Sequence, residues 1–140
     1  MKSKTENATE RADVPAVEGP RGELCTRTLA MPGFANPSGD IFGGWVLSQM
    51  DIAGGIAAGQ LAQGRVVTVA VDAMTFVLPV HVGDVLCVYS EMVKTGRSSM
   101  TIHLEAWAQR DRIGREELVT QGTFTFVAVD EDGRPQALPK

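Results

Sequence analysis

A single acid, Asp40, stands three residues before the pair Gly43 and Gly44, and an apolar run with helical spacing follows. The first N–H groups of a helix have no acceptor within the helix, and the helix dipole adds partial positive charge there. Glycines at such a start leave room for a ligand, so these N–H groups could hold an anion or an oxyanion. A neighbouring carboxylate could act as a general base or a nucleophile. From the residues alone, the simpler interpretation is that Asp40 or Ser38 caps the helix.

Other reactive residue types do not indicate a second site. No serine stands in a G-x-S-x-G motif, which argues against a serine-hydrolase elbow. We interpret His81, in a Pro-Val-His-Val-Gly turn, and His103, in a strand-like run, as exposed or satisfied side chains. Neither histidine has metal-ligand spacing to a cysteine or an acid, so we expect no metal and no cofactor.

Composition excludes several classes of partner. The chain has 140 residues, which suits one domain, and its net charge of -4 attracts neither nucleic acid nor an anionic membrane. No apolar run approaches the ~20 residues of a spanning helix, so we expect no membrane insertion. The first residues lack the apolar core of a secretory signal. Cys25 and Cys87 form no CxxC motif, and we interpret them as reduced thiols of a cytoplasmic protein.

The first 22 residues differ in composition from the rest. They are polar, charged and interrupted by proline and glycine, and they hold too little apolar surface to become ordered. We expect a flexible tail over 1–22 and one folded domain over 23–140. Within that domain, residues 24–30 indicate a short strand, and the Pro/Gly-rich residues 31–39 indicate a loop.

A long helix is predicted next, ending at Gly64. Its apolar face, at helical spacing, consists of Val46, Met50, Ala53, Ala57 and Leu61. Glycine inside a helix costs ~1 kcal/mol relative to alanine. We therefore interpret Gly54 and Gly55 as residues that allow the helix backbone to approach a sheet closely.

Four strand-like runs follow Arg65: VVTVAVDAMTFVLPV, DVLCVYSEMVKTG, SSMTIHLEAWAQR and REELVTQGTFTFVAV. The turns HVGD, KTGRSS and RDRIG separate them, and such short turns predict antiparallel neighbours. Residues 66–77 are apolar on both faces, which predicts cover by the helix on one side and by a partner chain or a sheet continuation on the other. Asp72 is an unusual acid in this run. Three interpretations of Asp72 are open: it pairs with another side chain, it lies at an interface, or it is a second catalytic carboxylate. We favour a structural role.

Three blocks of the chain resemble the YciA-like acyl-CoA thioesterases of the hotdog fold. In order, they are TLAMPGFANPSGDIFGGWVLSQMD, GRVVTVAVDAMTFVLPVHVGDVL and GRSSMTI, and the resemblance covers residues 27–139. It implies an α+β hotdog fold, in which a curved antiparallel sheet wraps one long central helix and joins a second copy's sheet edge to edge. It also implies a homo-oligomer with the dimer as the minimal unit, and the family often forms a trimer of dimers.

The resemblance further implies hydrolysis of acyl-CoA to free fatty acid and CoA. The catalytic acid of the family's G-D-I-F-G-G-W block corresponds to Asp40, and the backbone that holds the thioester carbonyl corresponds to Gly43 and Gly44. In the family, CoA lies in a cleft between subunits. The turn that matches part of this cleft consists of Gly96, Arg97, Ser98 and Ser99. The spacing around Asn36 differs from the family pattern, and Asn36 is assigned no role.

The residue types agree with thioester chemistry, because a thiolate is a good leaving group and needs no activated triad. A carboxylate suffices, as a base on water or as a nucleophile, and the sequence does not choose between the two. The alternative function is a non-catalytic acyl-CoA binding or sensing module on the same fold, which would not need Asp40 beside the glycines. A hotdog hydratase would need an Asp-His pair in the active-site segment, and the sequence shows none there.

Overall fold

The computed structural model describes residues 19–110 and 114–140, so most of the expected tail over 1–22 lies outside the described residues. Its elements are β2 (Glu23–Leu29), η1 (Pro32–Phe34), α1 (Gly43–Ala62), β3 (Val66–Phe76), β4 (Val85–Thr95), β5 (Ser99–Gln109) and β6 (Glu116–Ala128). The predicted helix and all predicted strands are confirmed. No helix in the described ranges is long and apolar enough to cross a membrane.

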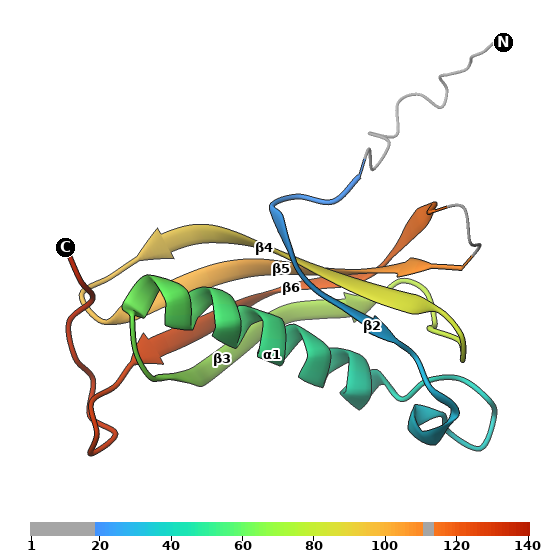
Figure 1. Ribbon diagram of the computed structural model, residues 1–140, viewed down its shortest axis with the longest axis horizontal. Coiled ribbons are helices and arrows are strands. Elements are labelled where there is room, and N and C mark those ends of the chain that lie inside the picture. Colours follow the sequence, from blue (N-terminus) through green and yellow to red (C-terminus); the bar gives the residue numbers. More distant parts are fainter. Residues whose placement is uncertain (1–18, 111–113) are drawn as a thin grey trace, which may run out of the picture.

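The five strands form one antiparallel sheet in the order β2-β4-β5-β6-β3, and α1 lies along one face of it (Figure 1). The predicted pairing across HVGD is wrong, because β3 pairs with β6 and not with β4. Residues 77–84 instead cross from β3 to β4, past β6 and β5. Three strand spacings amount to about 14 Å, and eight extended residues reach about 27 Å, so a short segment can make this crossing.

The helix buries a strip of small and apolar residues against the sheet: Val46, Met50, Ala53, Gly54, Ala58 and Ala62. The predicted apolar face of the helix is buried over its first residues, but its last residue, Leu61, is 43% exposed. The helix also ends one residue earlier than predicted. Gln63 takes the left-handed conformation with a φ of 55°, while Gly64 donates its N–H to the Gly59 carbonyl. Leu61 therefore projects from the last turn away from the core.

The two inner glycines of the helix differ in their surroundings. A Cβ on Gly54 would lie 2.7 Å from the Phe126 ring and 2.9 Å from the Leu104 side chain. A Cβ on Gly55 would lie 3.9 Å from the same ring, which is an ordinary contact. The packing interpretation is confirmed for Gly54, whereas the described chain gives Gly55 room for a methyl group.

Strand β3 forms one edge of the sheet and leaves much of its apolar surface open. Its exposed apolar residues, with the residue that follows the strand, are Val69, Val71, Phe76 and Val77. The register with β6 shifts between Asp72 and Thr75, where Ala73 has a φ of 57°. Asp72 itself is exposed. The helix of the same chain covers only one face of the sheet. That a second chain covers the exposed side of β3 therefore stays a prediction.

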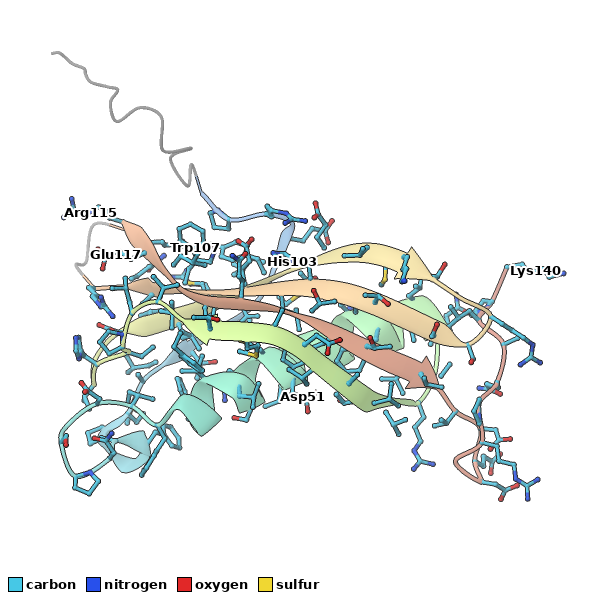
Figure 2. All side chains as sticks on the ribbon, turned by 180° about the vertical axis from the view of Figure 1, so that it is seen from behind. Asp51, His103, Trp107, Arg115, Glu117 and Lys140 are labelled. Carbon is cyan, nitrogen blue, oxygen red and sulfur yellow. The ribbon has the colours of Figure 1, made fainter. Side chains whose placement is uncertain are left out.

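His103 and Trp107 lie on the sheet face that points away from α1 (Figure 2). Glu105, a buried carboxylate of the same strand, contacts both of them. His103 Nε2 lies 2.7 Å from one carboxylate oxygen, and Trp107 Nε1–H donates to the other at 2.9 Å. The Arg21 backbone N–H also donates to Glu105, at 3.2 Å. Burial raises the pKa of Glu105, but these hydrogen bonds outweigh it and hold that pKa below its ordinary value. His103 is thus a satisfied side chain, as predicted.

Candidate active site

The loop before α1 is shaped by Asn36, to which the sequence assigned no role. Its side-chain oxygen accepts hydrogen bonds from the backbone N–H groups of Ser38, at 2.9 Å, and Asp40, at 3.1 Å. The Asn36 N–H donates in turn to the Asp40 carbonyl at 2.6 Å. Phe34 stacks on Trp45, with ring centroids 5.1 Å apart, and fixes the loop to the first turn of the helix. These contacts hold Asp40 in a defined place.

Asp40 does not cap the helix. The N-cap residue is Phe42, and no side chain makes a capping hydrogen bond there, so the capping interpretation of Asp40 and Ser38 is wrong. The Asp40 carboxylate instead lies beside an imidazole, with Oδ1 3.2 Å from His81 Nδ1. Both side chains are about half exposed, at 46% and 52%. The carboxylate is therefore accessible, and it makes no capping hydrogen bond to the N–H groups at the start of α1.

His81 reaches this position from the 77–84 connection. The residue pairs with Asp40 in an isolated antiparallel bridge, and the neighbouring Ile41 N–H donates to the Val80 carbonyl at 2.9 Å. The His81 side chain is exposed, as predicted, but its contact with Asp40 is one that the sequence did not predict. A hydratase was discounted above because the active-site segment contains no Asp-His pair. The folded chain does form such a pair, from Asp40 and His81 of two different segments, so the missing pair no longer argues against a hydratase. No local pattern links the two residues, because the bridge depends on the crossing connection.

The glycine pair begins α1, three residues after Asp40. Gly43 and Gly44 are both exposed, and their N–H groups belong to the first turn, where a helix supplies no acceptor. A Cβ on Gly44 would have no heavy atom within 4 Å, whereas one on Gly43 would touch the Phe76 ring at 3.4 Å. A groove of about 320 Å³ lies between Gly43, Val46 and Phe76. Gly43 thus borders an apolar groove at the start of α1, three residues after Asp40.

The turn formed by Gly96, Arg97, Ser98 and Ser99 lies elsewhere. It joins β4 to β5 and is closed by a 2.8 Å hydrogen bond from the Gly96 N–H to the Ser99 carbonyl. The exposed Arg97 lines a groove of about 330 Å³ together with Leu61, in the last turn of α1, and Lys140. Lys140 and the loop before α1 lie at opposite ends of the molecule (Figure 2).

One chain therefore does not bring the predicted CoA turn to Asp40. The helix has 20 residues, so its two ends are about 30 Å apart. Asp40 precedes its first turn, and the groove at Arg97 borders its last. This separation agrees with the cleft between subunits that the resemblance implies, in which the acid and the turn come from different copies of the chain.

Known proteins resemble this chain over most of its length. Residues 38–114 match the family model described as the thioesterase superfamily. The acyl-CoA thioester hydrolase YciA of Salmonella typhimurium is 53% identical over 123 residues, which cover 86% of this chain and 92% of that protein.

Two solved structures show the same fold. A hexameric thioesterase from Yersinia pestis is 56% identical with a TM-score of 0.83, and the match covers 87% of this chain and 99% of that one. A hexameric hotdog fold thioesterase of Campylobacter jejuni is 42% identical with a TM-score of 0.77, and the match covers 84% and 91% of the two chains. The predicted hotdog fold is confirmed. The chain belongs to the thioesterase superfamily, among the hotdog-fold relatives of the YciA acyl-CoA thioester hydrolases.

Proposed function

We propose that this chain hydrolyses acyl-CoA thioesters to a free fatty acid and CoA, with Asp40 as the catalytic carboxylate. The observation that carries the proposal is the position of Asp40, which is held beside the open start of α1 and does not cap it. A binding module would have no use for a fixed, accessible carboxylate at that place. The relatedness to acyl-CoA thioester hydrolases supports the choice of thioester.

The reaction uses groups whose chemistry suits each step. The Gly43 and Gly44 N–H groups bind the thioester carbonyl oxygen and stabilise the oxyanion that forms on it. Asp40 takes a proton from water as the water oxygen attacks the carbonyl carbon. The C–S bond then breaks and CoA leaves as a thiolate, which takes up the proton. In the other route, Asp40 attacks directly and forms a mixed anhydride, which water hydrolyses.

We propose that the complete site is shared between two copies of the chain. The apolar β3 edge is open, and pairing of two such edges would continue the sheet. A two-fold axis would place the two helices side by side in opposite directions, so that the loop with Arg97 from one copy lies near Asp40 of the other. Arg97, with Lys140 in the same groove, supplies positive charge for the CoA phosphates.

Thiol release from a panel of acyl-CoA substrates, followed with a thiol-reactive dye, tests this function. We expect turnover with at least one acyl chain length and a loss of turnover in Asp40→Asn. Binding of acyl-CoA without thiol release across the whole panel would instead support the binding or sensing module. Formation of hydroxyacyl-CoA from enoyl-CoA, with no thiol release, would support a hydratase.

A further inference from the structure

The Asp40 carboxylate has a specific neighbour that the reaction described above does not use. His81 Nδ1 lies 3.2 Å from Asp40 Oδ1, a distance for one hydrogen bond. The backbones of the two residues are also paired, so this contact does not depend on two freely moving side chains. A carboxylate that must meet a water or a carbonyl carbon works only in a narrow range of orientations.

We propose that His81 is a positioning residue: its Nδ1–H donates to Asp40 Oδ1, fixes the carboxylate plane and leaves the second oxygen, Oδ2, for the reaction. The inference rests on the proposed role of Asp40. His81 contributes no bond to the substrate. It restricts the rotation of the Asp40 side chain, whose half-exposed carboxylate would otherwise sample several orientations.

The backbone that carries the imidazole is fixed by hydrogen bonds within and around the 77–84 connection. The His81 backbone N–H donates to Asp84 Oδ2 at 2.8 Å, and the same Asp84 oxygen accepts from Arg110 Nε at 3.1 Å. Arg110 also donates to the Pro79 carbonyl and to Glu117 Oε1. The charged groups around His81 are thus Asp40, with Asp84, Arg110 and Glu117 behind its backbone. This network fixes the backbone of His81 and leaves Asp40 as the acid that its ring contacts.

Three substitutions separate positioning from chemistry by His81 itself. In His81→Asn, the amide nitrogen occupies about the place of Nδ1 and still donates to Asp40. In His81→Gln, the amide nitrogen reaches the place of Nε2, and in His81→Ala no donor remains. We expect kcat with the best acyl-CoA of the panel to fall on the order of 10-fold in His81→Ala and His81→Gln, with little change in KM. His81→Asn should restore most of that loss.

The split between kcat and KM, together with rescue by His81→Asn, gives a readout that a merely structural role would not move. Loss of a structural contact would lower the amount of folded protein and would not be restored by a side chain that replaces only the Nδ1 donor.

Each outcome bears on the proposal. Full activity in His81→Ala, or a loss in His81→Asn as large as in His81→Ala, would overturn it, the latter because it would make His81 itself the base. Asp40→Asn, measured in parallel, keeps the two proposals apart. If Asp40→Asn retains near-full turnover, the proposed function fails; if Asp40→Asn is inactive and His81→Ala is not, only the positioning role fails.

Discussion

At the scale of single residues, Asp40→Asn removes charge and basicity but keeps the size of the side chain and an oxygen that can accept from His81. We expect kcat to fall on the order of 10²-fold or more, as for loss of a general base. The melting temperature should barely change, because Asp40 is half exposed and caps nothing. Ser38→Ala, in the same loop, is the control and should retain turnover. Near-full turnover in Asp40→Asn would contradict the mechanism.

Arg97 is the residue whose role depends most on the CoA part of the substrate. If it contacts a phosphate, Arg97→Ala should raise KM for acyl-CoA about tenfold, which corresponds to about 1.4 kcal/mol for one charge-assisted hydrogen bond. Hydrolysis of a short thioester without the nucleotide should stay unchanged, because only uniform binding is lost. Arg134→Ala, an exposed arginine at another turn, serves as the control. Equal effects on both substrates would remove Arg97 from the nucleotide site.

The sequence offered the candidate site residues that belong to one continuous block and missed the neighbours that reach Asp40 from elsewhere. Asp40, Gly43 and Gly44 share one motif, which lies at the start of α1. His81 joins them through a backbone bridge that no local pattern encodes. Asn36 acts through its side chain on the loop backbone, a role that a family motif does not record.

At the scale of elements, the contact between α1 and the sheet depends on Gly54. Gly54→Ala should lower the free energy of unfolding by about 1–3 kcal/mol, because the new methyl group would overlap the buried Phe126 and Leu104. Gly55→Ala is the matched change one residue away, and should be neutral or stabilising by up to about 1 kcal/mol through helix propensity. Urea unfolding of both variants measures the difference. Equal stability would mean that the helix can move away from the sheet.

Glu105 makes the outer face of the sheet sensitive to acid. Because the folded-state pKa of Glu105 is lowered, its contribution to stability is full above the unfolded pKa of about 4.3 and is lost as pH falls through the folded pKa. Glu105→Gln should therefore be less stable than the parent protein at pH 7 by about 1–3 kcal/mol. The difference should shrink as the pH falls below about 4. Urea midpoints at several pH values measure it, and a constant difference would contradict the assignment.

Periodicity predicted the elements well but not every neighbour. The helical and alternating patterns are local properties, and they gave α1 and the strands within a few residues. Whether β3 pairs with β4 or with β6 is decided by total burial and by the reach of residues 77–84, which no short window contains. The end of α1 was misplaced for a related reason, since Gln63 accepts a left-handed conformation that glycine usually takes.

At the scale of the whole molecule, the separation of Asp40 from Arg97 predicts complementation between two inactive proteins. When Asp40→Ala is mixed with a protein altered at residues 97–99, under conditions that exchange subunits, each mixed dimer regains one site with both intact parts. Activity should rise well above that of either parent. If exchange is demonstrated and no activity returns, the acid and the turn act within the same chain. Sedimentation as a monomer at micromolar concentration would contradict the shared site altogether.

The strand order also has a consequence for how the chain folds. Strands β4, β5 and β6 are consecutive in sequence and adjacent in the sheet, so their pairing closes short loops. The two outer strands pair with distant partners, as Val66 does with Ala128 and Glu23 with Ser90, and such contacts form slowly because long loops must close first. Pulsed hydrogen exchange should find amides of the central three strands protected first. The strand edge that we propose for dimer pairing would then be the last to mature, which delays assembly until each subunit is nearly complete.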